Sequence, residues 1–158
     1  MMTKTLAVLL LILGLICAAP AHDGLDLLPP ITAPDAWNVL RLCEANMVKL
    51  VAEKAWKELT PQLALSTEAI QFLQTSGGED ASGHEHLDTA LKAAATLDQV
   101  SRNGDGTAIQ QALKSYQSKL AAAAADFDPK VVKADVFSCP MCKDIRELDP
   151  KARCSNVA

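Results

Sequence analysis

The chain has 158 residues and a formal net charge of -4, and 49% of its residues are hydrophobic. This length fits about one domain with a core of its own. A net-acidic chain without a basic cluster excludes nucleic acid and anionic membrane surfaces as main partners. The composition also excludes a collagen and a disordered tail.

Residues 1–21 have the pattern of a secretory signal peptide. Lys4 gives a positive start, residues 6–18 are uncharged and almost wholly apolar, and Ala19-Pro20-Ala21 offers small residues for cleavage. The apolar run is shorter than the roughly 20 residues that span a bilayer. We therefore expect a secreted or periplasmic protein without a membrane span, whose mature chain begins at His22.

Four segments between residues 34 and 127 carry apolar residues at every third or fourth position, which is the spacing of amphipathic helices. Glycines and prolines stand between these segments and not within them. We predict helices from Pro34 to about Ala55, from Thr60 to about Gln74, from about Leu87 to Asn103 and from Gly106 to Ala125.

These helices, with a loop over residues 76–83, predict an all-α fold: an antiparallel four- to five-helix bundle. Residues 22–33 are expected to form an extended lead-in, and Thr60-Pro61 to cap the second helix. Asp128-Pro129 favours a fifth, shorter helix, although the valines after it also suit an extended strand. Residues 128–158 would pack on the bundle.

Four cysteines remain once residues 1–21 are removed: Cys43, Cys139, Cys142 and Cys154. An even number in a small exported chain is typical of a two-disulfide framework, with three connectivities open. Cys43 lies on the apolar stripe of the first helix. We therefore expect Cys43 to be buried and bridged to the C-terminal cluster, so that disulfides pin the C-terminal segment.

The motif Cys139-Pro140-Met141-Cys142, followed by Lys143, resembles locally the active-site turn of thioredoxins. The resemblance implies a reactive thiol at Cys139. Thioredoxins place this turn early in the chain, whereas only 16 residues follow Cys142.

The same two cysteines have the spacing that attaches c-type haem, and cytochromes of the c-prime kind are similar exported four-helix bundles. Lys143 stands where their axial histidine is required. Thiolates together with the Met141 thioether also suit copper as Cu(I) or another soft metal.

A second metal candidate is the pair His84 and His86. Two histidines separated by one residue in a loop can hold zinc or copper, provided that further ligands are present. The structural alternative is that both are solvated loop residues.

No catalytic residue is predicted. The sequence has no Gly-x-Ser-x-Gly turn, no phosphate-binding glycine loop and no His-Glu-x-x-His helix. Its alanines and leucines, with few aromatic residues, permit a modest apolar pocket between helices.

The leading hypothesis is a non-enzymatic exported protein that binds a protein partner or a small apolar ligand and is stabilised by two disulfides. The alternative is a redox or metal protein, holding haem or a soft metal, that uses Cys139, Met141 and Cys142.

Overall fold

The computed structural model of the protein describes residues 30–76, 81–138 and 146–147. Most of these residues are helical, which confirms the predicted all-α class. The elements in chain order are α1 (Ala33–Ala52), the 3-10 helix η1 (Trp56–Glu58), α2 (Leu59–Ser76), α3 (Ala81–Asn103), α4 (Gly106–Ala124), α5 (Pro129–Val132), β1 (Phe137–Ser138) and β2 (Arg146–Glu147). The predicted signal peptide lies outside the described residues.

Helix α1 begins and ends where local chemistry requires. The Thr32 hydroxyl accepts a hydrogen bond from the backbone N–H of Asp35 at 3.3 Å, and a proline stands in the first turn. At the other end Lys54 adopts a left-handed backbone with φ of 59°, which stops the helix before the predicted limit at Ala55. The chain then passes through η1 directly into α2.

A tight turn joins α3 to α4. Gly104 has φ of +72°, a conformation that glycine adopts without a steric cost. The next residue, Asp105, caps α4 because its carboxylate accepts from the backbone N–H groups of Thr107 and Ala108 at 3.0 and 3.2 Å. The turn and the cap allow α4 to run back alongside α3 as a helical hairpin.

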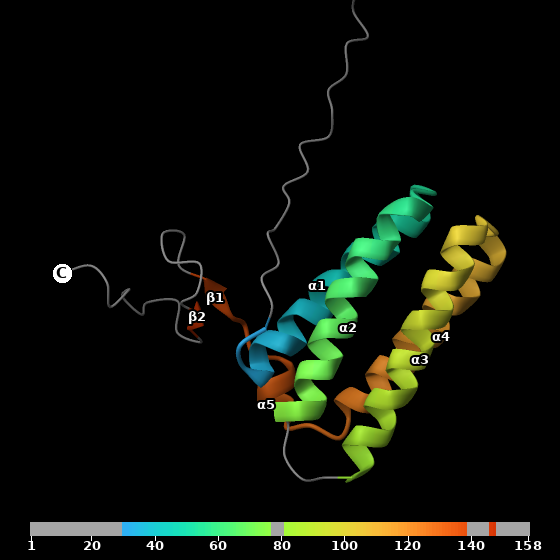
Figure 1. Ribbon diagram of the computed structural model, residues 1–158. Coiled ribbons are helices and arrows are strands. Elements are labelled where there is room, and N and C mark those ends of the chain that lie inside the picture. The colour runs from blue at the N-terminus through green and yellow to red at the C-terminus, as the bar shows by residue number, and fades with distance from the viewer. Residues whose placement is uncertain (1–29, 77–80, 139–145, 148–158) are drawn as a thin grey trace, which may run out of the picture.

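Successive long helices pack side by side and run in opposite directions, as Figure 1 shows. Trp37 of α1 packs edge-on against Phe127 beyond α4, with ring centroids 5.2 Å apart. The short helix α5 lies against α1, where an Arg41 Nη2 donates to the backbone oxygen of Ala134 at 2.6 Å. The largest fully buried apolar side chains are Trp37, Tyr116, Leu40, Met47, Leu59, Ile70, Leu73, Leu87, Leu97 and Ile109.

Two predicted boundaries are wrong. Helix α2 begins at Leu59, so Thr60 lies inside the first turn and is not the cap. Helix α3 begins at Ala81, so the predicted loop over residues 76–83 is shorter than expected and the two histidines lie in a helix.

The chain after α5 is extended, which is the alternative that its valines allowed. Strand β1 pairs with β2 in antiparallel register, with Phe137 opposite Glu147 and Ser138 opposite Arg146.

In the ranges that the structure describes, no helix is long and apolar enough to cross a bilayer.

Candidate functional site

The C-terminal candidates Cys139, Met141, Cys142 and Cys154 lie outside the described residues. The described chain reaches Ser138, directly before the motif, and resumes at Arg146. Because these two residues pair across β1 and β2, the two ends of the segment that contains the motif are neighbours.

Cys43 is fully buried, as predicted, but its thiol is free. The part of the chain that the structure describes therefore lacks the disulfide that the sequence predicts for Cys43. The physical reason is its position: Cys43 faces the centre of the helical core between Leu40 and Met47 of α1. A disulfide needs Cα atoms within about 7 Å, so the C-terminal segment would have to enter this core.

Two polar side chains from two other helices lie beside this thiol. Ser66 of α2 and Tyr116 of α4 are both fully buried. The Ser66 hydroxyl lies close enough to Cys43 and Tyr116 to lower the pKa of each. Among the described residues, however, neither hydroxyl has a hydrogen-bond partner of regular geometry. We refer to Cys43, Ser66 and Tyr116 as the core polar cluster.

Burial decides the protonation of the core polar cluster. Loss of solvent raises the pKa of the Cys43 thiol, and the contact with Ser66 lowers it by less. Burial likewise raises the pKa of Tyr116 well above its usual range, with smaller upward contributions from Cys43 and Glu44. Both groups stay neutral at physiological pH, and a neutral, enclosed thiol is a poor nucleophile and a poor metal ligand.

His84 and His86 do not lie on the same side of a helix. Both lie in α3, and residues two apart in a helix point to different sides of it. His86 Nδ1 instead lies 2.6 Å from an Asp126 carboxylate oxygen beyond the end of α4. Within residues 30–76, 81–138 and 146–147, no group of three or more His, Cys, Asp or Glu side chains could hold a metal ion.

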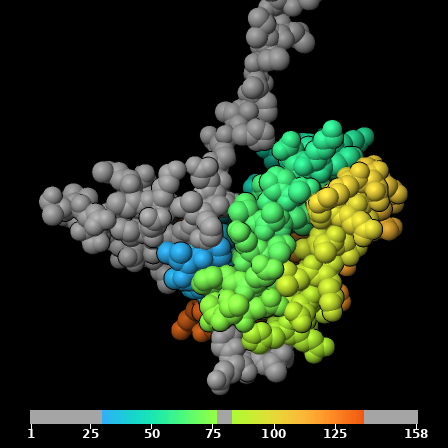
Figure 2. Space-filling model, viewed as in Figure 1, coloured from blue at the N-terminus to red at the C-terminus, as the bar shows by residue number. Residues whose placement is uncertain are grey.

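The described surface has a groove of about 340 Å³ between α2 and α3, which we call the α2–α3 groove. Figure 2 shows the two helices side by side on one face of the molecule. The residues that line the groove recur at helical spacing along each helix. From α2 they are Thr60, Leu63, Ala64 and Thr67. From α3 they are Leu91, Ala94, Ala95, Asp98 and Arg102.

Small side chains explain why the groove is open. The methyl groups of Ala64, Ala94 and Ala95 leave space that larger side chains would fill where the two helices meet. Leu63 is buried and Leu91 is partly buried, so the floor of the groove is apolar. The groove can therefore remove apolar surface of a ligand from water.

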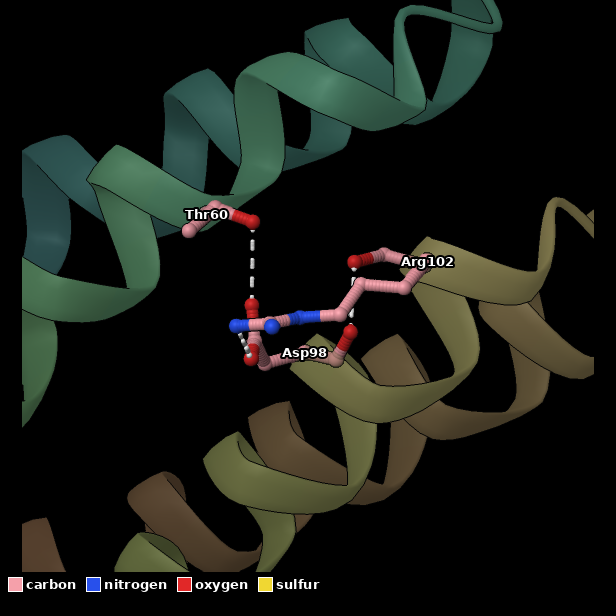
Figure 3. A network of polar contacts seen from close by, with 4 residues as sticks. Thr60, Asp98 and Arg102 are labelled. Carbon is pink, nitrogen blue, oxygen red and sulfur yellow. Dashed lines mark hydrogen bonds and ion pairs between the residues drawn. The ribbon is translucent and has the colours of Figure 1, made fainter.

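One end of the α2–α3 groove carries a polar network, drawn in Figure 3. The Thr60 hydroxyl donates to Asp98 Oδ1 at 3.0 Å, and Arg102 Nη2 donates to Asp98 Oδ2 at 2.6 Å. Beyond the opposite end, Gln74 Nε2 donates to Asp88 Oδ1 at 2.6 Å. The groove therefore has an apolar floor and one polar end, and the Gln74–Asp88 bond joins α2 to α3 outside its lining.

The sequence indicated only a modest apolar pocket somewhere between helices, gave Thr60 the role of a helix cap and did not single out Asp98 or Arg102. A partial signal was present, since Leu91, Ala94, Ala95, Asp98 and Arg102 share one face of a helix and end in an acid–base pair at i, i+4. Nothing in the sequence paired that face with α2.

Compared with protein-family models, with curated proteins and with solved structures, this chain shows no match.

Proposed function

We propose that this chain is an exported helical-bundle protein that acts by binding, without catalysis, and that its ligand is a small apolar molecule held in the α2–α3 groove. The groove itself carries the proposal, because it has a volume of about 340 Å³, an apolar floor and a polar end at Asp98 and Arg102. Small-molecule sites are concave and mostly apolar, with volumes from about 300 to 1,000 Å³.

The state of the polar side chains supports binding over catalysis. Asp98, the acidic residue of the groove, already accepts hydrogen bonds from Thr60 and Arg102. The nucleophilic side chains of the core polar cluster are fully buried and kept neutral by burial. A catalytic site needs an acid, base or nucleophile that is free to act on its substrate, and the carboxylate of the groove is engaged by Thr60 and Arg102.

Export rests on the amino-acid pattern of residues 1–21. The predicted two-disulfide framework needs Cys43, whose thiol is free, so pairing within the C-terminal segment fits better. N-terminal sequencing of the secreted protein tests cleavage after Ala21. Non-reducing peptide mapping tests which of Cys139, Cys142 and Cys154 are joined.

Groove binding is tested by filling the groove. Ala95→Phe places a ring in the space left by the Ala95 methyl group, whereas Ala45→Phe adds the same ring on an exposed position of α1. With a neutral apolar fluorophore such as N-phenyl-1-naphthylamine, we expect saturable binding by the parent and by Ala45→Phe. We expect at least tenfold weaker binding by Ala95→Phe.

Equal binding by both variants would place the fluorophore elsewhere. No saturable binding by the parent would count against a small-ligand function. Circular dichroism of each variant shows whether it is folded, so that loss of binding is not confused with loss of structure.

A second candidate function is a redox or soft-metal protein that uses Cys139, Met141 and Cys142. The observation in its favour is that paired residues of β1 and β2 flank this motif, while Cys43 is a free core thiol that leaves three cysteines in the C-terminal segment. Native mass spectrometry separates the readings, because bound haem or metal adds its mass to the intact chain. A chain without added mass, with its C-terminal cysteines in a stable disulfide, contradicts this candidate.

A further inference from the structure

We propose that the α2–α3 groove selects a single-chain amphiphile with an anionic head group, and that Arg102 binds the head group. This inference rests on the proposed function, because it names the class of ligand for the same groove. The geometry behind it is the placement of one guanidinium at the end of an apolar floor.

Asp98 holds Arg102 in a defined position. Its Oδ2 accepts from Arg102 Nη2 at 2.6 Å, and its Oδ1 accepts from Thr60 at 3.0 Å, as Figure 3 shows. Because Thr60 also bonds Asp98, the guanidinium has a positioned partner at the groove end. A guanidinium that is already oriented loses less conformational entropy when it binds an anion.

Arg102 keeps donors for a ligand. A guanidinium has five N–H donors in a fixed plane, and the bond to Asp98 uses an N–H of Nη2. The Arg102 side chain is 67% exposed, so the rest of this plane is accessible from solvent. Carboxylate, phosphate and sulfate groups match that geometry with two parallel hydrogen bonds.

The charges at this end favour an anion over a cation. The Arg102 side chain is more exposed than the Asp98 side chain, so an incoming ammonium group would meet a guanidinium that repels it before it reaches the carboxylate. The Asp98–Arg102 pair is neutral as a whole. Attraction therefore comes from directed hydrogen bonds of Arg102 at short range, and we expect it to be modest.

The floor fits a linear tail. Leu91 and Arg102 lie about 16 Å apart along α3 at 1.5 Å per residue, and Ala94 and Ala95 lie between them. A tail along this line would cover Leu63 and Leu91 while its head group reaches Arg102. Because the groove is open on one side, we expect affinity to rise by about twofold to threefold per added methylene, below the value for full burial.

The test compares three ligands with the same ten-carbon tail: decanoate, decanol and decyltrimethylammonium. Each displaces N-phenyl-1-naphthylamine from the full mature chain at low salt and below its micelle concentration. We expect decanoate to bind about fivefold more tightly than decanol and decyltrimethylammonium to bind most weakly, as for one partly exposed charged contact.

Arg102→Gln removes the cation, and Lys114→Gln removes an exposed cation from α4 as the matched control. We expect Arg102→Gln to bind decanoate no more tightly than decanol, because Asp98 keeps its negative charge, while Lys114→Gln keeps the parent preference. Raising the salt concentration should reduce the preference for decanoate in the parent and in Lys114→Gln, because exposed charges are screened.

Two results overturn the inference while leaving the proposed function intact: equal affinities for the three ligands in the parent, or an unchanged preference in Arg102→Gln. Tighter binding of decyltrimethylammonium than of decanoate also overturns it. Absence of saturable binding by every probe, including the fluorophore, counts against the proposed function itself and removes the inference with it.

Discussion

Polar side chains differ in burial and in hydrogen bonding between the core polar cluster and the α2–α3 groove. In the core, the Ser66 and Tyr116 hydroxyls are fully enclosed, and among the described residues they have no regular hydrogen-bond partner. In the groove, Thr60, Asp98 and Arg102 satisfy one another at the surface. The thiol and hydroxyls of the core polar cluster are thus enclosed, whereas the polar side chains at the groove are at the surface and bonded to one another.

The difference follows from the size of the side chains where helices meet. Around Cys43, large residues such as Leu40, Met47 and Tyr116 fill the interior. Between α2 and α3, alanines leave a space that is open to solvent. Packing therefore closes one region and leaves the other open to solvent.

The largest expected effect tests whether the two regions differ in packing. Leu40→Ala removes a fully buried side chain beside Cys43, so it should lower the free energy of unfolding by about 3 kcal/mol. Leu91→Ala removes a partly buried side chain at the groove and should cost about 1 kcal/mol. Urea denaturation of both variants measures the two values. Equal losses would contradict the comparison.

The second prediction concerns alkaline pH. Burial raises the pKa of Cys43 above its ordinary value of 9.0 and that of Tyr116 above its ordinary value of 10.0. The folded state therefore favours the neutral forms. Their contribution to stability is complete below these ordinary values, and it declines as the pH rises from them toward the raised pKa of each folded group.

We expect a loss of up to about 1.4 kcal/mol per pH unit for each group. Urea denaturation at a series of pH values from 8 upward measures the slope. Tyr116→Phe should abolish the loss of stability that begins near pH 10. Cys43→Ala should abolish the loss that begins near pH 9. A slope that is the same in parent and both variants would show that other groups cause it.

At neutral pH, Tyr116→Phe should leave stability unchanged or raise it by about 1 kcal/mol. The reason is that the hydroxyl is buried, and no described residue offers it a regular hydrogen bond, so its removal ends a desolvation cost. Ser66→Ala should behave in the same direction. A thermal melt of each variant measures the change, and a clear decrease in melting temperature for both would show that the two hydroxyls are well bonded.

The smallest expected effect belongs to the groove. Asp98→Asn weakens the contacts with Thr60 and Arg102, which lie at the surface, so it should cost about 0.5 kcal/mol. The cost should shrink at high salt because the ion pair is screened. Urea denaturation at two salt concentrations checks both points. A loss above about 2 kcal/mol would mean that this network holds α2 to α3.

Much of the helical layout could be predicted from spacing alone. The apolar stripes placed Trp37, Leu40 and Cys43 inward, and all three are buried. Ser66 was not singled out, although it lies between Leu63 and Ile70 on the inward stripe of α2. A polar residue on such a stripe is the signal that could have indicated a buried hydroxyl.

The wrong predictions for Thr60 and Gly83 share a cause, which is that each was based only on neighbouring residues in the sequence. Thr60 stands before a proline and was expected to cap a helix, yet η1 leads directly into α2 and the hydroxyl is available to Asp98, 38 residues away. Gly83 was expected to lie in a loop, yet it is a buried residue of α3 that packs against Phe127. In both cases a contact with another element outweighed the local preference.

The sequence by itself determined the helical class and the inward face of each helix, because these follow from the 3.6-residue period of a single segment. Only the tertiary structure decided that Cys43 meets Ser66 and Tyr116, and that Ala64 faces Ala94 across a groove ending at Arg102. Such pairings depend on how each helix is rotated and inclined against its neighbours, and side chains from every helix set that packing together.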